Sequence, residues 1–182
     1  MDIVDLPLLS PADADRLRTA PHTYPDPGLT RADDAAIPGF LPLRRSRAIG
    51  HGRARFDDAS ELLLTWQVLY RSGIRPTVSA SRVAAGEVVQ QRVPPFTPLV
   101  APCRIVYVID EPDRRGFAYG TLAGHPERGE ERFVVTHDRE TDVVRFEVFS
   151  VSRPTTLWLA AFPVLRPMQH FFVGRFLRAA TV

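Results

Sequence analysis

One stretch of the sequence concentrates side chains suited to acid–base chemistry: GHPERGEERF, residues 124–133. It holds a histidine and several glutamates, and a glutamate beside a histidine can orient the imidazole, raise its pKa and make it a general base. Gly124, Pro126 and Gly129 instead favour a hairpin loop, whose charged side chains would form solvated ion pairs. Two hypotheses therefore stay open: a charged hairpin at the end of a sheet, or a polar rim around a binding site.

The strands that flank this stretch bear on the second hypothesis. Because side chains alternate along a strand, Tyr119 and Thr121 share one face of the preceding strand, and Glu131 and Phe133 share one face of the next. If these faces point inward, Tyr119, His125 and Glu131 could contact the polar end of a ligand. An enzyme that uses His125 and a glutamate as its acid–base pair is the sharper version of this idea.

A second charged stretch, RRSRAIGHGRAR, could hold an anion through arginine forks and backbone amides. It lacks the lysine and the spacing of a Walker loop, and it lacks the aromatic side chains of a single-strand nucleic-acid platform. The alternative is a charged edge strand that discourages pairing with another sheet. Every cation of the chain is an arginine, so arginine here is weak support for phosphate recognition. We expect no specific binding of nucleic acid, only weak contacts that salt removes. The arginines concerned are Arg44, Arg45, Arg47, Arg53 and Arg55.

Three further features complete the set of candidate sites. Arg145 and Glu147 share a face of VVRFEVFSVS, so they form either a surface ion pair or, if that face points into a cavity, a ligand anchor. Cys103 begins the apolar run CRIVYVID and is interpreted as a buried structural thiol. The five histidines of the chain show no metal-ligand spacing, so no metal and no other cofactor is predicted.

The composition is that of an ordinary globular protein. The chain has 182 residues, of which 45% are hydrophobic and 24% charged, and its net charge is +2. This length suits one domain whose core is large enough for a small cavity. No apolar run is long enough to span a membrane, the first residues are acidic where a secretory signal is basic, and a lone cysteine forms no internal disulfide. These features predict a cytoplasmic protein and leave its oligomeric state open.

Residues 1–36 are predicted to form an N-terminal arm packed on a domain of residues 37–182. Pro21, Pro25 and Pro27 prevent a regular helix over much of the arm. A short helix is expected over residues 11–18, with Ser10 as its N-cap and Pro11 in the first helical position.

Two longer helices are predicted in the domain. In DDASELLLTWQVLYRSG, Asp58 is the expected N-cap, Trp66 belongs to the apolar stripe and Gly73 ends the helix. The C-terminal segment 155–180 is helical by its period, and Pro163 and Pro167 predict a break near residues 162–166. The apolar stripe of this last helix consists of Leu157, Ala161, Leu165, Met168, Phe172 and Phe176.

Strand patterns fill the region between these helices. A first strand precedes the central helix, and TVSASRVA and EVVQQRV form a hairpin joined at Ala85-Gly86. After a proline-rich link, CRIVYVID, GFAYGTL, EERFVVTHD and VVRFEVFSVS follow with short turns, which indicates an antiparallel sheet. The order predicts an α+β helix-grip fold, in which a curved antiparallel sheet of about seven strands wraps around the long C-terminal helix.

Several segments carry a resemblance to known families. The order of elements over residues 40–180 resembles the START and Bet v 1 superfamily, whose members commonly hold an apolar cavity between the sheet and the last helix. The segments TYPDPGLTR, IGHGRARF, CRIVYVIDEP, GFAYGTLAGHPERGEERF and FEVFSVSRP together resemble the bacterial and plant domain-of-unknown-function nineteen-ninety family. That resemblance spans about residues 22–180 and implies a small cytoplasmic protein. It brings no established reaction, so it assigns no catalytic residue.

The sequence thus favours a protein that binds a small apolar or amphipathic molecule in a cavity between the sheet and the C-terminal helix. Two alternatives remain: an enzyme on the same scaffold that acts on a hydrophobic substrate, and a protein-interaction module that uses the N-terminal arm. Whether any reaction is catalysed stays open, and no catalytic residue is assigned. The candidate residues of the cavity rim and lining are Tyr107, Tyr119, Thr121, His125, Glu127, Glu131, Arg145, Met168 and Phe172.

Overall fold

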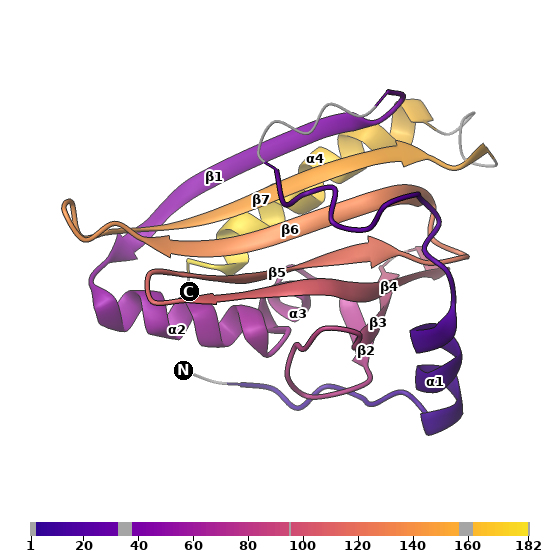
Figure 1. Ribbon diagram of the computed structural model, residues 1–182, viewed down its shortest axis with the longest axis horizontal. Helices are drawn as coiled ribbons and strands as arrows, with labels where there is room; N and C mark the ends of the chain where they lie inside the picture. Colours follow the sequence, from indigo (N-terminus) through magenta and orange to yellow (C-terminus); the bar gives the residue numbers. More distant parts are fainter. Residues whose placement is uncertain (1–2, 33–37, 95, 157–161, 182) are drawn as a thin grey trace.

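The computed structural model of the chain describes residues 3–32, 38–94, 96–156 and 162–181. Four helices and seven strands are described in it, and their order confirms the predicted succession of strand, helix, six strands and terminal helix. Figure 1 shows the elements, which are α1 (Pro11–Thr19), β1 (Leu41–His51), α2 (Arg53–Leu64), α3 (Gln67–Arg71), β2 (Arg75–Val78), β3 (Val88–Val93), β4 (Phe96–Glu111), β5 (Arg114–Thr121), β6 (Glu127–His137), β7 (Val143–Pro154) and α4 (Phe162–Ala179).

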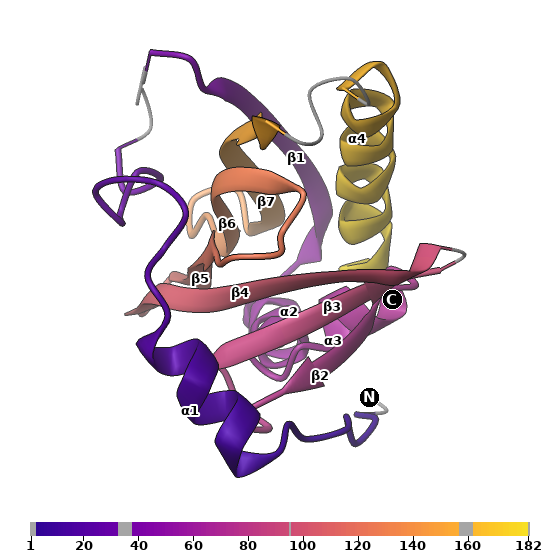
Figure 2. The ribbon, with the colours of Figure 1, turned by 90° about the vertical axis from the view of Figure 1, so that its right-hand side faces the viewer.

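The seven strands form one antiparallel sheet in the order β1-β7-β6-β5-β4-β3-β2. Strands β2 to β6 each pair with the next strand along the chain, as short turns require. Only β1 departs from this order: it pairs with β7, and α2 and α3 carry the chain from this edge of the sheet to the opposite edge at β2. The sheet bends strongly, and α4 lies along its concave side (Figure 2). The predicted helix-grip arrangement is therefore confirmed.

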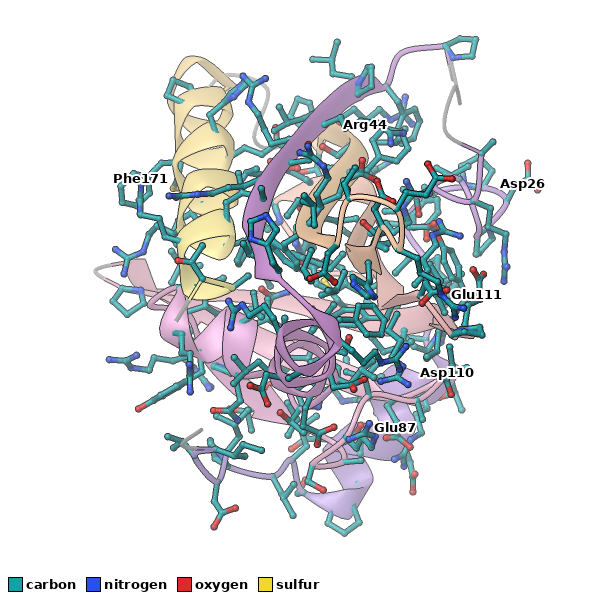
Figure 3. The ribbon with its side chains drawn as sticks, turned by 90° about the vertical axis from the view of Figure 1, so that its left-hand side faces the viewer. Asp26, Arg44, Glu87, Asp110, Glu111 and Phe171 are labelled. Atoms are coloured by element: carbon teal, nitrogen blue, oxygen red, sulfur yellow. The ribbon has the colours of Figure 1, made fainter. Side chains whose placement is uncertain are left out.

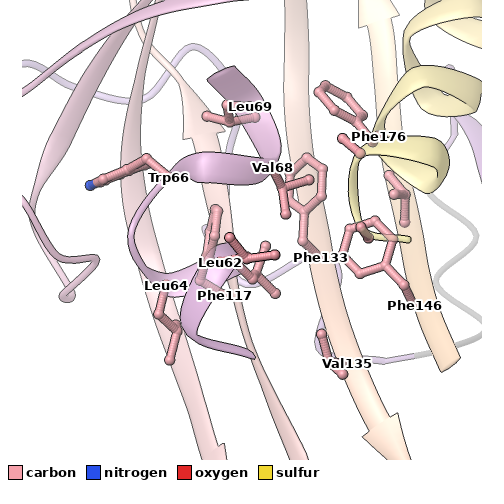
Figure 4. Packing of buried hydrophobic residues seen from close by; sticks show 14 of the residues in the cluster. Leu62, Leu64, Trp66, Val68, Leu69, Phe117, Phe133, Val135, Phe146 and Phe176 are labelled. Carbon is pink, nitrogen blue, oxygen red and sulfur yellow. The ribbon is translucent and has the colours of Figure 1, made fainter. Parts of the chain in front are cut away.

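The main core lies between the concave face of the sheet and the three helices α2, α3 and α4. Phe117, Phe133 and Phe146 come from neighbouring strands and are fully buried, with the ring of Phe133 5.4 Å from that of Phe117 and 6.3 Å from that of Phe146. Phe176 of α4 meets Phe133 edge to face at 5.2 Å (Figure 4). Aromatic pairs at these separations add to the free energy gained from burial. This cluster attaches α4 to the sheet.

The central helix differs from the prediction. It begins at Arg53, after Gly52 with φ 88°, so Asp58 is an interior residue and not the N-cap. The early start buries Phe56 completely, and Arg53 pairs with Asp57 one turn later. The helix also breaks at Trp66, which adopts a left-handed φ of 65° and donates from its indole N–H to the carbonyl of Ala80. Burial of the indole outweighs the cost of this backbone conformation.

The proline-rich segment that we expected to be a link belongs to β4, which begins at Phe96. Pro102 is tolerated because β5 ends at Thr121, opposite Cys103, so β4 has no β5 partner beyond that point. The connection between β2 and β3 spans residues 79–87 and is longer than a tight hairpin at Ala85-Gly86. The expected short turn between β4 and β5 is confirmed at Pro112-Asp113.

The N-terminal helix and the C-terminal helix both follow the sequence closely. Helix α1 has Ser10 as its N-cap, whose hydroxyl accepts from the amide of Asp13, and Pro11 opens the helix. Helix α4 begins at Phe162, so Pro163 lies in its first turn and Pro167 lies inside it. Of the predicted stripe, Leu157, Ala161 and the side chain of Leu165 lie outside the described residues. No described helix is long and apolar enough to span a membrane.

Candidate functional site

A cavity of about 120 Å³ lies between the concave face of the sheet and α4. Its walls are mostly apolar, and its polar groups gather where β5, β6 and β7 approach α4. A cavity of this kind, with a few converging polar groups, is the usual form of a small-molecule site. The residues that line it are Ile74, Gln91, Val93, Ala101, Tyr119, Thr121, His125, Pro126, Glu127, Gly129, Glu130, Glu131, Ser150, Ser152, Met168, Gln169, Phe172, Val173 and Phe176.

Tyr119 and Glu131 form the central polar pair of this cavity. They stand opposite each other in the antiparallel pairing of β5 and β6, and the Tyr119 hydroxyl donates to a Glu131 carboxylate oxygen at 2.6 Å. Directly opposite residues of an antiparallel pair have close Cβ atoms, so the register itself brings the two side chains together. The side chains of Tyr119 and Glu131 therefore both point into the cavity, as the alternation along the two strands suggested.

Burial gives the Glu131 carboxyl an unusual acidity. Loss of water around it raises its pKa to about 7, with a small addition from the charge of Glu127, while the hydrogen bond from Tyr119 acts in the opposite direction. Burial, followed by the neighbouring Glu131 charge, also raises the pKa values of the Tyr119 phenol and the Cys103 thiol well above their ordinary range. Near neutral pH Glu131 thus exchanges between its protonated and its ionised form, while Tyr119 keeps its proton.

His125 contributes to the same wall but does not form the expected pair. Its Nδ1 lies 3.0 Å from the backbone nitrogen and from the carbonyl oxygen of Glu127, and burial lowers its pKa to about 4. The described partner of the Glu131 carboxylate is Tyr119, whereas the described contacts of His125 are with the backbone of Glu127. The acid–base pair of His125 and a glutamate that the sequence suggested is therefore not found among the described contacts of His125. The loop that carries His125 is also shorter than we expected, because β6 already begins at Glu127.

The cavity is closed on the helix side by a residue that the sequence analysis missed. The side-chain amide of Gln169 donates to the Glu127 carboxylate at 3.2 Å and to the hydroxyls of Ser150 and Ser152 at 3.3 and 3.0 Å. Gln169 follows Met168 and thus lies at the border of the apolar stripe. A single polar residue at that border is the only feature of the sequence that could have indicated its role. Gln91, which bonds the buried Cys103 thiol, was missed as well.

Of the nine candidate residues, seven line this cavity and two do not. Arg145 is an exposed residue of β7, while its neighbours Val144 and Phe146 belong to the main core. Tyr107 packs on the opposite face of the sheet with Ile109, Ala118 and Val134. A β-bulge between Ile105 and Tyr107 explains this, since one extra residue moves every later side chain to the other face. The prediction that Tyr107 and Arg145 belong to the cavity is therefore wrong.

The hypothesis of a solvated charged loop is also wrong, because part of the stretch is buried on the outer face of the sheet. Glu130 is 2% exposed, and its carboxylate accepts from the Tyr24 hydroxyl at 2.8 Å, the Gly28 amide at 2.7 Å and the Thr30 amide at 3.0 Å. The Thr30 hydroxyl donates to it too. The buried guanidinium of Arg132 donates to the Thr30 carbonyl at 2.7 Å. TYPDPGLTR and GEERF thus meet in space.

The arginine-rich stretch around β1 corresponds to the edge-strand alternative. Strand β1 is an edge of the sheet, and Arg45 and Arg47 are exposed on it. Arg44 donates to both carboxylate oxygens of Glu147 at 3.0 Å, and Arg55 donates to the carbonyl of Ile49 at 3.0 Å. These contacts stabilise the fold and leave no preformed anion cradle among the described arginines of this stretch.

No group of three or more potential ligands that could hold a metal ion occurs among the described residues. The half-buried His137 lies 2.9 Å from Asp142 through Nε2, at the end of the sheet away from the cavity loop. This contact joins the two ends of the β6–β7 connection and is part of the fold.

Comparisons with known proteins agree with this architecture. Residues 23–179 match the family described as Domain of unknown function (DUF1990). A UPF0548 protein of Deinococcus radiodurans is 34% identical over 132 residues, which are 66% of this chain and 66% of that protein. A UPF0548 protein of Dictyostelium discoideum is 42% identical over 66 residues, 32% of this chain and 30% of that protein. The matches thus span less than two thirds of either relative.

Solved structures show the same fold at low sequence identity. A hypothetical protein from Helicobacter pylori superposes with a TM-score of 0.59 at 11% identity, over 80% of this chain and 89% of that one. A major latex-like protein from Panax ginseng superposes with a TM-score of 0.52 at 17% identity, over 79% of this chain and 96% of that one. At these identities the likeness concerns the fold alone.

Proposed function

The chain belongs to the DUF1990 family, and we propose that it binds a small amphipathic molecule in the cavity between the sheet and α4, as a cytoplasmic protein. The observation that carries this proposal is the Tyr119–Glu131 pair, a buried, hydrogen-bonded polar group that faces a mostly apolar cavity. Burying a carboxyl without strong pairing is costly for a fold. Hydrogen bonding of a ligand to the pair would explain why the fold keeps a buried carboxyl at this position.

The size of the cavity limits the ligand. An apolar cavity of roughly 150 Å³ accepts a molecule the size of benzene, whereas sites for drug-sized ligands measure roughly 300–1,000 Å³. At about 120 Å³, the cavity suits a molecule with a single small ring or a short chain, or one end of a longer molecule.

Native mass spectrometry of the purified protein tests the proposal. We expect a small molecule that stays bound to the wild-type chain and is lost from Ala101→Leu, which places extra carbon atoms into the cavity from β4. Ala48→Leu adds the same atoms at an exposed position of β1 and is the matched control. Equal retention of the molecule by all three proteins would place binding elsewhere and contradict the proposal.

A second candidate function is acid–base catalysis on the bound molecule. The observation in its favour is the Glu131 pKa of about 7, since a catalytic acid or base works best when its pKa lies near the operating pH. In this version Tyr119 takes the place that the sequence analysis gave to His125. Incubation of wild type and Glu131→Gln with the co-purified molecule tests it: a change in the mass of the molecule with wild type alone is the expected result, and no change with either protein argues for binding only.

The protein-interaction alternative receives less support from the geometry. It requires the N-terminal arm to be available, but Tyr24, Gly28 and Thr30 of the arm are engaged by Glu130. We therefore retain ligand binding as the proposal.

A further inference from the structure

The outward side of α4 combines an exposed aromatic side chain with positive charge. Phe171 is 53% exposed, and it is the one aromatic residue among the exposed large hydrophobic side chains of the described residues. Figure 3 shows Phe171 on the side of α4 that points away from the sheet. A single exposed apolar side chain is ordinary on a protein surface. The charges around Phe171 are what point to a partner.

Two arginines share this side of α4. Arg175 and Arg178 follow Phe171 by four and seven residues, a spacing that keeps side chains on one face of a helix. The Arg175 guanidinium lies 5.6 Å from the centroid of the Phe171 ring. A Cβ at Gly174 would lie 4.0 Å from Nη1 of Arg178, so this exposed arginine bends back along the same face. No carboxylate of the described residues pairs with either guanidinium.

The part of the chain that forms this side is free of acidic residues. Residues 148–182, which include α4, contain four arginines and neither an aspartate nor a glutamate, although the whole chain has 23 basic and 21 acidic residues. Helix α4 packs mainly against β7, α3 and β1, and the one acidic residue of these three elements is Glu147. Its carboxylate accepts from two arginines on the opposite face of the sheet. Glu127 of β6 contacts α4 through Gln169, on the cavity side.

Two kinds of anionic partner suit a basic surface, a membrane with acidic lipids and a nucleic acid. Acidic headgroups attract arginines, and an exposed phenylalanine inserts at the boundary between headgroups and acyl chains. A single-stranded nucleic acid stacks its bases on aromatic rings. Arg175 already lies over one face of the Phe171 ring, and the described part of α4 has no second exposed aromatic side chain. These contacts favour the membrane.

We propose that the outward side of α4 docks on an anionic membrane surface. The ring of Phe171 enters the headgroup region, and Arg175 and Arg178 lie against the lipid phosphates. The bound chain stays on the surface of the bilayer, held by one aromatic side chain and by charge. This contact is separate from the cavity, which lies on the other side of α4, and it does not depend on the proposed function.

Sedimentation with lipid vesicles tests the proposal. Vesicles of phosphatidylcholine with about 30% phosphatidylserine are compared with vesicles of phosphatidylcholine alone. We expect the wild-type chain to bind the anionic vesicles at least about tenfold more tightly than the neutral ones, since two arginines face the acidic headgroups. Binding should weaken as the salt concentration rises from about 0.1 M to about 0.5 M, because salt screens exposed charges.

Variants locate the contact on α4. Phe171→Ala should weaken binding to the anionic vesicles by about tenfold, because its ring no longer enters the interface. Arg178→Gln should weaken it by about fivefold, which corresponds to about 1 kcal/mol for one arginine near such a surface. Leu8→Ala, at a residue that is 64% exposed near the N-terminus, is the control for the lost apolar surface. Arg145→Gln removes one charge from an exposed residue on the opposite face of the sheet and is the control for charge. Both controls should bind as wild type.

Several results would overturn the proposal. They are no binding to the anionic vesicles, equal binding to neutral and anionic vesicles, or unchanged binding in both Phe171→Ala and Arg178→Gln. Binding of a single-stranded oligonucleotide that both variants weaken, without binding to vesicles, would overturn it in favour of a nucleic-acid partner. Retention of a small molecule in native mass spectrometry concerns the cavity alone, so the two proposals succeed or fail separately.

Discussion

Among single residues, Glu131 links the stability of the fold to pH. Its pKa is about 7 in the folded chain and 4.5 in the absence of a fold, so the folded state holds a proton that the unfolded state releases. The resulting stabilisation is fully present below about pH 4.5 and is lost as the pH rises to about 7. We expect Glu131→Gln, which stays neutral, to gain on the order of 1–3 kcal/mol relative to wild type between pH 5 and pH 8, since one pKa unit is worth about 1.4 kcal/mol.

Urea unfolding of both proteins at the two pH values measures this gain. The comparison with the variant is necessary because His22 and His125 act in the opposite direction. Burial lowers both of their pKa values to about 4, so their contribution to stability falls as the pH decreases from about 6.5 to about 4. Both proteins carry the two histidines, and the difference between them isolates Glu131. A difference that does not change with pH would contradict the raised pKa.

A second residue with a specific role is Gly129, where both the backbone conformation and the close approach of the neighbouring strand favour glycine. Its φ is 149°, and a Cβ there would lie 2.1 Å from the Val151 carbonyl oxygen of the paired strand β7. Gly86 has φ 85° with open space around it. We expect Gly86→Val to cost about 1–3 kcal/mol from the backbone alone, and Gly129→Val to cost more because β6 and β7 must separate. Thermal unfolding compares them, and equal losses would show that the close approach to Val151 has no importance.

At the scale of elements, the two parts of α4 differ in their surroundings: the part around Phe176 packs in the core, and the part around Phe172 lines the cavity. Phe176 is 3% exposed and packs on Phe133, whereas Phe172 is partly buried and lines the cavity. We expect Phe176→Ala to cost about 3–5 kcal/mol in free energy of unfolding, and Phe172→Ala to cost less, about 1–2 kcal/mol, because less apolar area is lost from it. Chemical denaturation of both variants measures the difference.

Phe171 provides the control within the same helix turn. It is 53% exposed, so Phe171→Ala should change the free energy of unfolding by about 0.5 kcal/mol or less. Ligand binding should follow a different order, in which Phe172→Ala weakens binding most. A larger loss of stability from Phe171→Ala than from Phe176→Ala would mean that the orientation of α4 is wrong.

The elements also show what a sequence can and cannot reveal. Period and turn residues were sufficient for the number and order of the strands, for the cap at Ser10 and for the inward position of Phe176, because these depend on neighbours in the chain. They did not place the start of β4 or the end of β2. The start of α2 was missed because Phe56 is held by tertiary burial, which outweighs the capping signal at Asp58. The face of Tyr107 was missed because a β-bulge leaves no mark in the alternation of residues. Local sequence patterns thus predict which helices and strands form, whereas tertiary packing determines where they begin and end.

The candidate site likewise has features that the sequence predicts and features that it does not. Alternation alone was enough to bring Tyr119 and Glu131 to one face, since that face follows from position along each strand. The hydrogen bond between Glu131 and Tyr119 depends on the register of β5 against β6, which the sequence does not specify. The hydrogen bonds of Gln169 depend on which face of α4 is directed toward β7. Contacts between elements are therefore what the sequence left undetermined.

On the scale of the whole molecule, residues 11–31 of the N-terminal arm and α4 lie on opposite sides of the sheet (Figure 2). Two adjacent residues of β6 serve the two sides: Glu131 faces the cavity and Glu130 faces the arm. Because the Glu130 carboxylate accepts from Tyr24, Gly28 and Thr30, we expect Glu130→Gln to release the arm. Loss of charge-assisted hydrogen bonds of this kind costs roughly 1.5–3 kcal/mol each when the donors stay buried, but a released arm regains water, so the total should stay near the value for a single bond.

Hydrogen–deuterium exchange distinguishes release of the arm from general unfolding. Amides of residues 23–31 should exchange faster in Glu130→Gln, while those of β5, β6 and β7 keep their protection, because these strands pair with each other along their length. The arm bonds β5 only at its end, where the Thr23 amide donates to the carbonyl of Thr121. Gly120→Ala should have the same effect by another route, since a Cβ there would lie 2.1 Å from the Tyr24 hydroxyl. Glu111→Gln, at an exposed end of β4, is the control and should leave exchange unchanged. Faster exchange throughout the sheet in Glu130→Gln would mean that the arm is part of the folding core, and that the division of the chain near residue 36 does not separate two structural units.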